Sequence, residues 1–351
     1  MDLTCPDSNV TKVAMKNLAR DKMNKLLMEN EMAAGKSLKD FLLSDEFDDE
    51  EDVSAYCEPL LADPKLVEGQ WYLPMPFCNQ GQFSDIYENS TKRALFGGDK
   101  GMYGFFLHVA KGVRALHRAG WVHNDLHGRN ALVTCSTEDI PGSCYASIID
   151  LGLASRKDTK VEGARGYRYS ISPEVIAMGY EENYPNPKSD VWELGMLLWE
   201  VRFGKDTLPT RNEPDLDAVM KVIPTLDFKE APFPELEEEP EVRNLLRGML
   251  TQDVSERWDI DRVILELEKL ALPTMRGPHE SAWLNAGCLL NPIIPAGSIV
   301  EIYGLKSKSA QHLNGKSGEV LKHHAGQGIY EIKLTDGEVK NVPGIRIRLI
   351  E

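Results

Sequence analysis

One stretch of the chain, residues 189–201, is apolar on nearly every side of the helix that it would form. A soluble protein accommodates such a helix only by burying it at the centre of a domain. The longest apolar run within it, residues 194–199, is far shorter than the roughly 20 residues that cross a bilayer. The pattern therefore predicts a soluble domain built around one central helix. Its apolar members are Val191, Trp192, Leu194, Met196, Leu197, Leu198, Trp199 and Val201.

Composition limits which partners the protein can bind and in which cellular compartment we expect it. The chain has 351 residues and a net charge of −15, which suits two or three domains that avoid phosphate backbones and anionic lipid. The six cysteines include no CxxC pair, no zinc-ligand spacing is present, and the N-terminus lacks a signal pattern. We therefore expect a cytoplasmic protein in a reducing setting, with no membrane or nucleic-acid partner.

Hydrophobic periodicity predicts a sequence of helices and strands before and around the central helix. A helix over 21–34 is expected to end at Gly35, and a strand over 71–77 is expected to lie at a sheet edge or to end early because of Pro74 and Pro76. The remaining expected elements are helices at 102–119, 241–250 and 259–271, a short strand at 121–122, and a hairpin of strands at 131–134 and 146–149.

The spacing of apolar residues changes in the last part of the chain. Residues 276–296 are irregular and contain several prolines and glycines, so we expect a linker there. From Gly297 apolar and polar residues alternate, and Asp336-Gly337 provides a hairpin turn. We therefore predict a separate, small β-barrel over 297–351.

Polar residues gather where the apolar strands end. The turn HNDLHGRN, residues 123–130, contains Asp125 and Asn130, and Asp150 ends the next apolar strand. Magnesium-dependent phosphoryl transfer needs one carboxylate that orients the attacking hydroxyl, and an amide oxygen and a second carboxylate that hold the metal. The order and spacing of these residues predict such a site, and the competing explanation is ordinary turn capping by Asp and Asn.

The same segments resemble the signatures of the eukaryotic protein kinase family. HNDLHGRN resembles HRDLxxxxN, DLG at 150–152 resembles DFG, and SPE at 172–174 resembles APE. In KSDVWELG, the resemblance implies that Asp190 holds the backbone of the catalytic loop, and it pairs Arg257 of SERW with Glu174 in a buried ion pair. His123 is expected to be structural.

The resemblance implies a two-lobed α+β kinase fold, with a partial N-lobe over 1–78, a helical C-lobe over 79–275 and an SH3-like or KOW-like barrel at the end. It implies a protein kinase that uses ATP and Mg2+ and phosphorylates protein Ser/Thr or Tyr hydroxyls. Asp125 and Arg129 are the implied catalytic residues, and Asn130 and Asp150 the implied metal ligands. The barrel would dock a peptide or protein.

Nucleotide-binding residues are implied in the first 78 residues. VAMK at 13–16 resembles the family's VAIK, which makes Lys16 the phosphate-binding lysine. Glu31 is its expected partner on the next helix, and Glu29 is the competitor. Met75 would lie at the entrance of the adenine pocket, and the hinge that follows it would contain Phe77 and Cys78.

Three departures from the family pattern bear on activity. A glycine-rich phosphate loop is not found, because the fifteen residues before Lys16 cannot form the two strands that carry it. We expect either a truncated version of a longer protein or a kinase-like fold that covers its nucleotide poorly. Asn124 replaces an arginine that receives an activation-loop phosphate, which weakens that form of control. His127 and Arg129 leave Ser/Thr and Tyr specificity open. The alternatives are a catalytically impaired kinase-like scaffold and a small-molecule kinase. Small-molecule kinases, however, lack an SPE-type segment and a DVWxxG helix.

Overall fold

The structure is a computed structural model that describes most of the chain. None of the described helices is both long enough and apolar enough to cross a membrane. The described residues are 13–18, 22–43, 57, 65–67, 70–76, 78–95, 97–135, 144–162, 166–167, 169–178, 182–204, 209–226, 228, 239–273, 294–302, 305, 310–324, 329–343 and 347–350.

A three-stranded antiparallel sheet opens the fold, in the order β1-β3-β2. Its strands are β1 (Val13–Leu18), β2 (Lys65–Val67) and β3 (Gln70–Pro76). β3 is therefore the middle strand, whereas its prolines predicted an edge. Among the described residues, β2 pairs with residues 70–72 only, so β1 is the one strand described beside Pro74 and Pro76. The missing N–H groups leave no ladder bond to β2 unmade.

Helix α1 (Lys22–Leu43) follows β1 and is longer than its sequence pattern predicted. Gly35 was expected to end it, but the helix continues for two more turns through this buried glycine. Leu38 and Leu42 extend the apolar stripe of Ala34 at four-residue spacing, and all three are almost fully buried. Tertiary packing of this stripe outweighs the modest helix penalty of one glycine.

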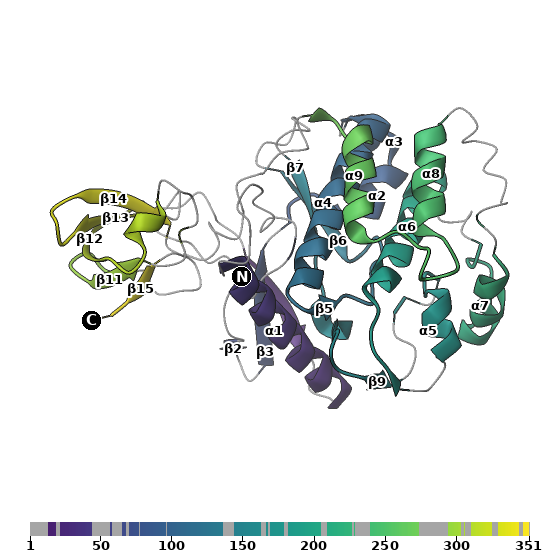
Figure 1. Cartoon of the computed structure of the whole chain (residues 1–351), viewed down its shortest axis with the longest axis horizontal. Helices are drawn as coiled ribbons and strands as arrows, with labels where there is room; N and C mark the ends of the chain where they lie inside the picture. The colour runs from purple at the N-terminus through teal and green to yellow at the C-terminus, as the bar shows by residue number, and fades with distance from the viewer. Residues whose placement is uncertain are drawn as a thin grey trace.

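The helical part of the chain surrounds α6 (Pro187–Phe203), as the apolar pattern predicted. Trp192, Leu194 and Leu198 on this helix are completely buried within one large core. Asn186 caps its N-terminus by accepting a hydrogen bond from the Lys188 amide. The other helices are α2 (Phe83–Glu88), α3 (Ser90–Leu95), α4 (Gly98–Arg118), α5 (Pro173–Met178), α7 (Leu216–Val222), α8 (Pro240–Met249) and α9 (Ile260–Leu270) (Figure 1).

Short strands link these helices and present the polar turns. The predicted hairpin is confirmed as β6 (Ala131–Cys135) paired with β7 (Cys144–Ile148), to which β4 (Gly81–Gln82) adds a third strand. A second small sheet pairs β5 (Trp121–Val122) with β8 (Ser155–Arg156), and a third pairs β9 (Val161–Glu162) with β10 (Glu182–Asn183). The turns before β6 and after β7 therefore lie at the same end of the hairpin.

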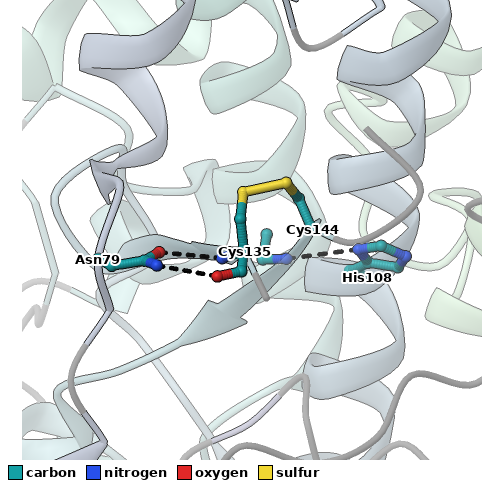
Figure 2. The surroundings of a disulfide bond; sticks show 5 residues. Asn79, His108, Cys135 and Cys144 are labelled. Carbon is teal, nitrogen blue, oxygen red and sulfur yellow. Dashed lines mark hydrogen bonds between the residues drawn. A yellow bond between two sulfur atoms is a disulfide. The ribbon is translucent and has the colours of Figure 1, made fainter. Parts of the chain in front are cut away.

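A disulfide joins Cys135, the last residue of β6, to Cys144, the first residue of β7, at the end of the hairpin opposite the polar turns (Figure 2). The scattered positions of the cysteines in the sequence did not indicate this pair. Strand pairing makes the two residues direct partners with Cα atoms 4.0 Å apart, although nine positions separate them in sequence. Asn79 binds the backbone of Cys135 at both its N–H and its C=O, at 2.9 and 2.8 Å.

The C-terminal strands have a hydrophobic core of their own, centred on Val300, Ile302 and Ile332. They form a five-stranded antiparallel sheet in the order β14-β13-β12-β11-β15, visible as a distinct body in Figure 1. No strand pair closes this sheet among the residues described, so the barrel stays a prediction. The strands are β11 (Ile299–Ile302), β12 (Ser317–His324), β13 (Ile329–Leu334), β14 (Val339–Pro343) and β15 (Ile347–Leu349). Most of the expected linker, residues 276–293, lies outside the described residues.

Candidate active site

Helix α6, the central helix, supports the turn between β5 and β6 through buried hydrogen bonds. Asp190 is fully buried on α6 and accepts hydrogen bonds from the backbone N–H groups of His123 and Asn124, both at 2.8 Å. His117 contacts the same carboxylate at 2.7 Å. This confirms the expectation that Asp190 supports the loop that carries Asp125.

Asp125 and Asn130 lie at opposite ends of this turn and contact each other. The Asn130 amide Nδ2 donates to the Asp125 backbone oxygen at 2.9 Å and to its carboxylate Oδ2 at 3.0 Å. The Asp125 carboxylate is largely buried, with 17% of its side chain exposed. Its position is thus fixed by the turn, and its second oxygen, Oδ1, has no hydrogen-bond partner among the described residues.

Asp150 reaches the same place from the end of β7. The Ile149 N–H donates to the Asn130 carbonyl at 3.0 Å, which brings Asn130 and Asp150 to neighbouring strand ends. Asp150 has φ of 65° and Asn124 has φ of 63°, the only non-glycine residues with positive φ in the described part of the chain. Such conformations are costly and gather at functional sites.

Lys16 joins the N-terminal sheet to Asp150. Its Nζ lies 2.8 Å from both Glu31 oxygens and 2.8 Å from Asp150 Oδ1. Of the two glutamates considered on α1, Glu31 is the buried one and Glu29 is exposed. Three elements far apart in sequence therefore meet in one ionic cluster with an excess of one negative charge.

Burial and charge shift the pKa values of this cluster. Burial acts to raise the pKa of Asp150, but the Lys16 ammonium outweighs it and holds this pKa below the ordinary value. Burial acts to lower the pKa of Lys16, and the carboxylates of Glu31 and Asp150 reverse this, so it is raised. Burial raises the pKa of Glu31 above its ordinary value, while Lys16 opposes the rise. The shifts of Asp150 and Lys16 therefore favour their charged forms, whereas that of Glu31 favours its neutral form.

The oxygen atoms left over in this cluster fit a hard divalent cation. Asp150 Oδ2 and the Asn130 side-chain oxygen have no hydrogen-bond or ion-pair partner among the described residues, because Asp150 makes its contacts through Oδ1 and Asn130 through Nδ2. Carboxylate and amide oxygens are suitable Mg2+ ligands. The donor set thus matches the implied metal.

The hinge residues are only partly described. Met75 on β3 is 8% exposed and pairs with Ala14, two positions before Lys16 on β1. Because pairs along an antiparallel ladder alternate between faces, Met75 shares a sheet face with Lys16. Cys78 is half-buried after β3, and Phe77 lies outside the described residues.

A cavity of about 680 Å³ lies beside the turn between β5 and β6. His127 on its wall has Nε2 3.6 Å from Asp125 Oδ2, and its ring lies 4.6 Å from that of Tyr167. The Arg129 guanidinium also lies over Tyr167, at 5.9 Å, so it faces the cavity. In the described part of the chain, no hydrogen bond or ion pair joins Arg129 to Asp125. The other lining residues are Gln82, Ser84, Asp85, Glu88, Gly128, Tyr169, Glu200 and Arg211.

A buried ion pair fastens the segment that follows the site. Arg257 is 1% exposed, and its two terminal nitrogens contact the Glu174 oxygens at 2.7 and 2.8 Å. The predicted pairing is therefore confirmed. Burial acts to raise the pKa of Glu174, but the Arg257 guanidinium outweighs it and lowers this pKa.

Sequence reasoning missed some polar residues near the turn. Glu193 on α6 is 2% exposed and accepts a hydrogen bond from the Leu126 N–H at 2.7 Å. One signal was available, because Glu193 is an acid three positions after Asp190 in a helix that is apolar on nearly every side. Sequence reasoning considered Asn124 only as the replacement of an arginine. Its side chain points inward, and its Nδ2 donates to the Leu153 carbonyl oxygen at 2.9 Å.

Comparisons with known proteins agree with this geometry. The chain is 28% identical over 236 residues to "Serine/threonine-protein kinase PEPKR2" of Arabidopsis thaliana, covering 63% of this chain and 45% of that protein. It is 24% identical over 237 residues to "Serine/threonine-protein kinase 16" of Homo sapiens, covering 64% and 72%. A third relative, "Serine/threonine-protein kinase mig-15" of Caenorhabditis elegans, is 30% identical over 145 residues, covering 40% and 12%.

This chain thus spans less than half the length of two of these three relatives. A family model described as "Protein kinase domain" matches residues 7–266. That range contains the N-terminal sheet, the catalytic turn and the central helix. The chain therefore belongs to the protein kinase family.

Proposed function

We propose that this chain transfers the terminal phosphoryl group of Mg2+-bound ATP to a serine or threonine hydroxyl of a protein. The observation that carries the proposal is the meeting of Lys16, Glu31 and Asp150 in one ionic cluster, next to Asn130 and Asp125. The named relatives, all serine/threonine kinases, support this acceptor over tyrosine.

Each residue has a role that follows from its surroundings. Lys16, held by two carboxylates, provides the cation that binds nucleotide phosphates, and Asn130 and Asp150 would hold the metal. Bound Mg2+ supplies neutralisation of phosphate charge. Met75, Phe77 and Cys78 would border the adenine.

Asp125 would orient the acceptor hydroxyl and accept its proton. Its carboxylate is fixed by Asn130 and lies next to the cavity of about 680 Å³, which would receive the acceptor residue. Arg129, which faces that cavity over Tyr167, would contact the protein substrate. Because phosphoryl transfer depends mainly on positioning, the fixed geometry of Asp125 matters more than its basicity.

The Asp125→Asn variant tests this assignment. Asparagine keeps the size of the side chain and loses the acceptor charge, so we expect near-normal stabilisation by Mg·ATP and peptide phosphorylation reduced about a hundredfold or more. Phosphate transfer to mixed peptides carrying Ser, Thr or Tyr measures the effect and identifies the acceptor. Asp261→Asn, an exposed acid on α9, is the matched control and should change neither quantity.

Two outcomes would contradict the proposal. Equal transfer by the wild-type chain and the Asp125→Asn variant would remove Asp125 from catalysis. No transfer by the wild-type chain, with Mg·ATP still bound, would favour the catalytically impaired scaffold.

We also propose that residues 297–351 form an SH3-like barrel that docks a peptide or protein. Its separate core and five antiparallel strands support this. A peptide array probed with the full chain tests the docking, and failure to bind any peptide through this module would contradict it.

A further inference from the structure

The peptide unit that follows Asp125 is held at both of its polar atoms. Its carbonyl oxygen, that of Asp125, accepts from Asn130 Nδ2 at 2.9 Å. Its N–H, that of Leu126, donates to Glu193 Oε2 at 2.7 Å. The orientation of this unit sets where the Asp125 side chain points, because the Cα of Asp125 belongs to it.

Glu193 and Asp190 divide the support of the turn between them. Asp190 binds the N–H groups of His123 and Asn124, which precede Asp125, whereas Glu193 binds the N–H that follows it. The two acids are three positions apart on α6, so they lie on the same face of the helix. Both are at most 2% exposed, so no water competes for these hydrogen bonds.

Glu193 also meets the segment that leads from Asp150 toward Glu174. Gly166 of this segment has φ of 122°, and a Cβ built on it would lie 2.8 Å from Glu193 Oε1 and 2.7 Å from the Asn124 carbonyl oxygen. Only glycine fits such a gap, since real Cβ atoms are not found this close to other atoms. Glu193 therefore lies between the catalytic turn and Gly166.

The surroundings of Glu193 disfavour its charged form. Burial raises its pKa well above the ordinary value, and the carboxylates of Asp190, Asp125 and Glu174 raise it further, while the Leu126 N–H opposes the rise. A neutral carboxyl still accepts a hydrogen bond through one oxygen. Glutamine has nearly the same shape and the same acceptor.

We propose that Glu193 is a positioning residue that sets the orientation of Asp125 by accepting a hydrogen bond from the Leu126 N–H while packed against Gly166. The inference rests on the proposed kinase function, because its effect on turnover acts through Asp125. It adds a residue outside the catalytic turn to those that determine the rate.

The test compares Glu193→Gln with Glu193→Met in the full chain. The two side chains are similar in size and uncharged, and only glutamine accepts the Leu126 hydrogen bond. We expect Glu193→Met to lower kcat for peptide phosphorylation about tenfold or more, because a buried N–H loses its partner. The KM for Mg·ATP should stay within about twofold, and Glu193→Gln should restore most of kcat.

Amide hydrogen exchange provides a second measurement that needs no turnover. In the Glu193→Met variant the Leu126 amide should exchange faster, while the His123 and Asn124 amides, bound by Asp190, keep their protection. If the wild-type chain transfers no phosphate, the proposed function fails, and the Leu126 amide still decides whether Glu193 holds the turn.

Three results would overturn the inference. They are a folded Glu193→Met variant with unchanged kcat, unchanged exchange at Leu126, and a Glu193→Gln variant as impaired as Glu193→Met. If Glu193→Met does not fold, Gly166→Ala replaces it, because the added Cβ must displace Glu193 or the Asn124 carbonyl. We expect the same loss of kcat there, and unchanged turnover would overturn the inference.

Discussion

Reduction of the Cys135–Cys144 disulfide should lower the free energy of unfolding of the kinase domain by about 2.7 kcal/mol. The two cysteines are nine positions apart, and closing a loop of about ten residues removes this much chain entropy from the unfolded state at 25 °C. Asn79 keeps its two hydrogen bonds to the Cys135 backbone in the reduced protein, since neither involves a sulfur atom. The folded hairpin should therefore survive reduction.

Urea unfolding with and without reductant measures this difference. Tryptophan fluorescence reports mainly on the kinase domain, because five of the six tryptophans lie before residue 276, none lies in residues 297–351, and Trp192 is fully buried in the core. At roughly 2 to 4 °C per kcal/mol, the melting temperature should fall by about 5 to 11 °C.

The double variant Cys135→Ala/Cys144→Ala is the control for the reductant. It should match the reduced wild-type chain and should not respond to reductant. Equal urea midpoints for oxidised and reduced wild-type chain, with bond breakage verified by peptide mass mapping, would refute the entropic argument. A purified, non-reduced chain with both thiols unbonded would refute the pairing itself.

Two further substitutions test the charged residues Asp150 and Glu174. Asp150→Asn should abolish the magnesium-dependent part of the thermal stabilisation by ATP, and an unchanged melting shift would contradict its role as a metal ligand. Glu174→Gln should lower the free energy of unfolding at pH 7 by about 3–5 kcal/mol, because it leaves Arg257 buried without a charged partner. Arg257 lowers the pKa of Glu174 in the folded protein below 4.5, so this loss of stability should persist above pH 4.5 and shrink as the pH falls through that lowered pKa. Urea titrations of both proteins at pH 7, 5 and 3 measure the difference. A difference that stays constant across these pH values would contradict the ion pair as its cause.

The ends of helices and the positions of strands within a sheet were not fully predictable from local sequence. Gly35 was expected to end the first helix because glycine is a frequent C-terminal cap, but Leu38 and Leu42 bury themselves beyond it and prolong the helix. The prolines of β3 likewise lie in a middle strand, because the neighbouring strand β2 is too short to reach them. Both differences arise from partners distant in sequence, which local propensity does not contain.

The cysteines show the same limit for chemistry. Neither their spacing nor the composition of the chain predicted that Cys135 and Cys144 would bond, since only the register of β6 with β7 makes them neighbours. The location of the protein in a reducing compartment stays a prediction.

The sequence by itself determined the family, the central helix and the candidate residues Lys16, Asp125, Asn130 and Asp150, because these depend on residue type and on short spacings. Tertiary structure decided which charges meet. Lys16 reaches Asp150 across 134 positions through the packing of the N-terminal sheet and α1 against the helical part. Glu193 supports the Asp125–Leu126 peptide from the central helix. Such contacts depend on distances between elements, and these distances are set by the packing of the whole domain.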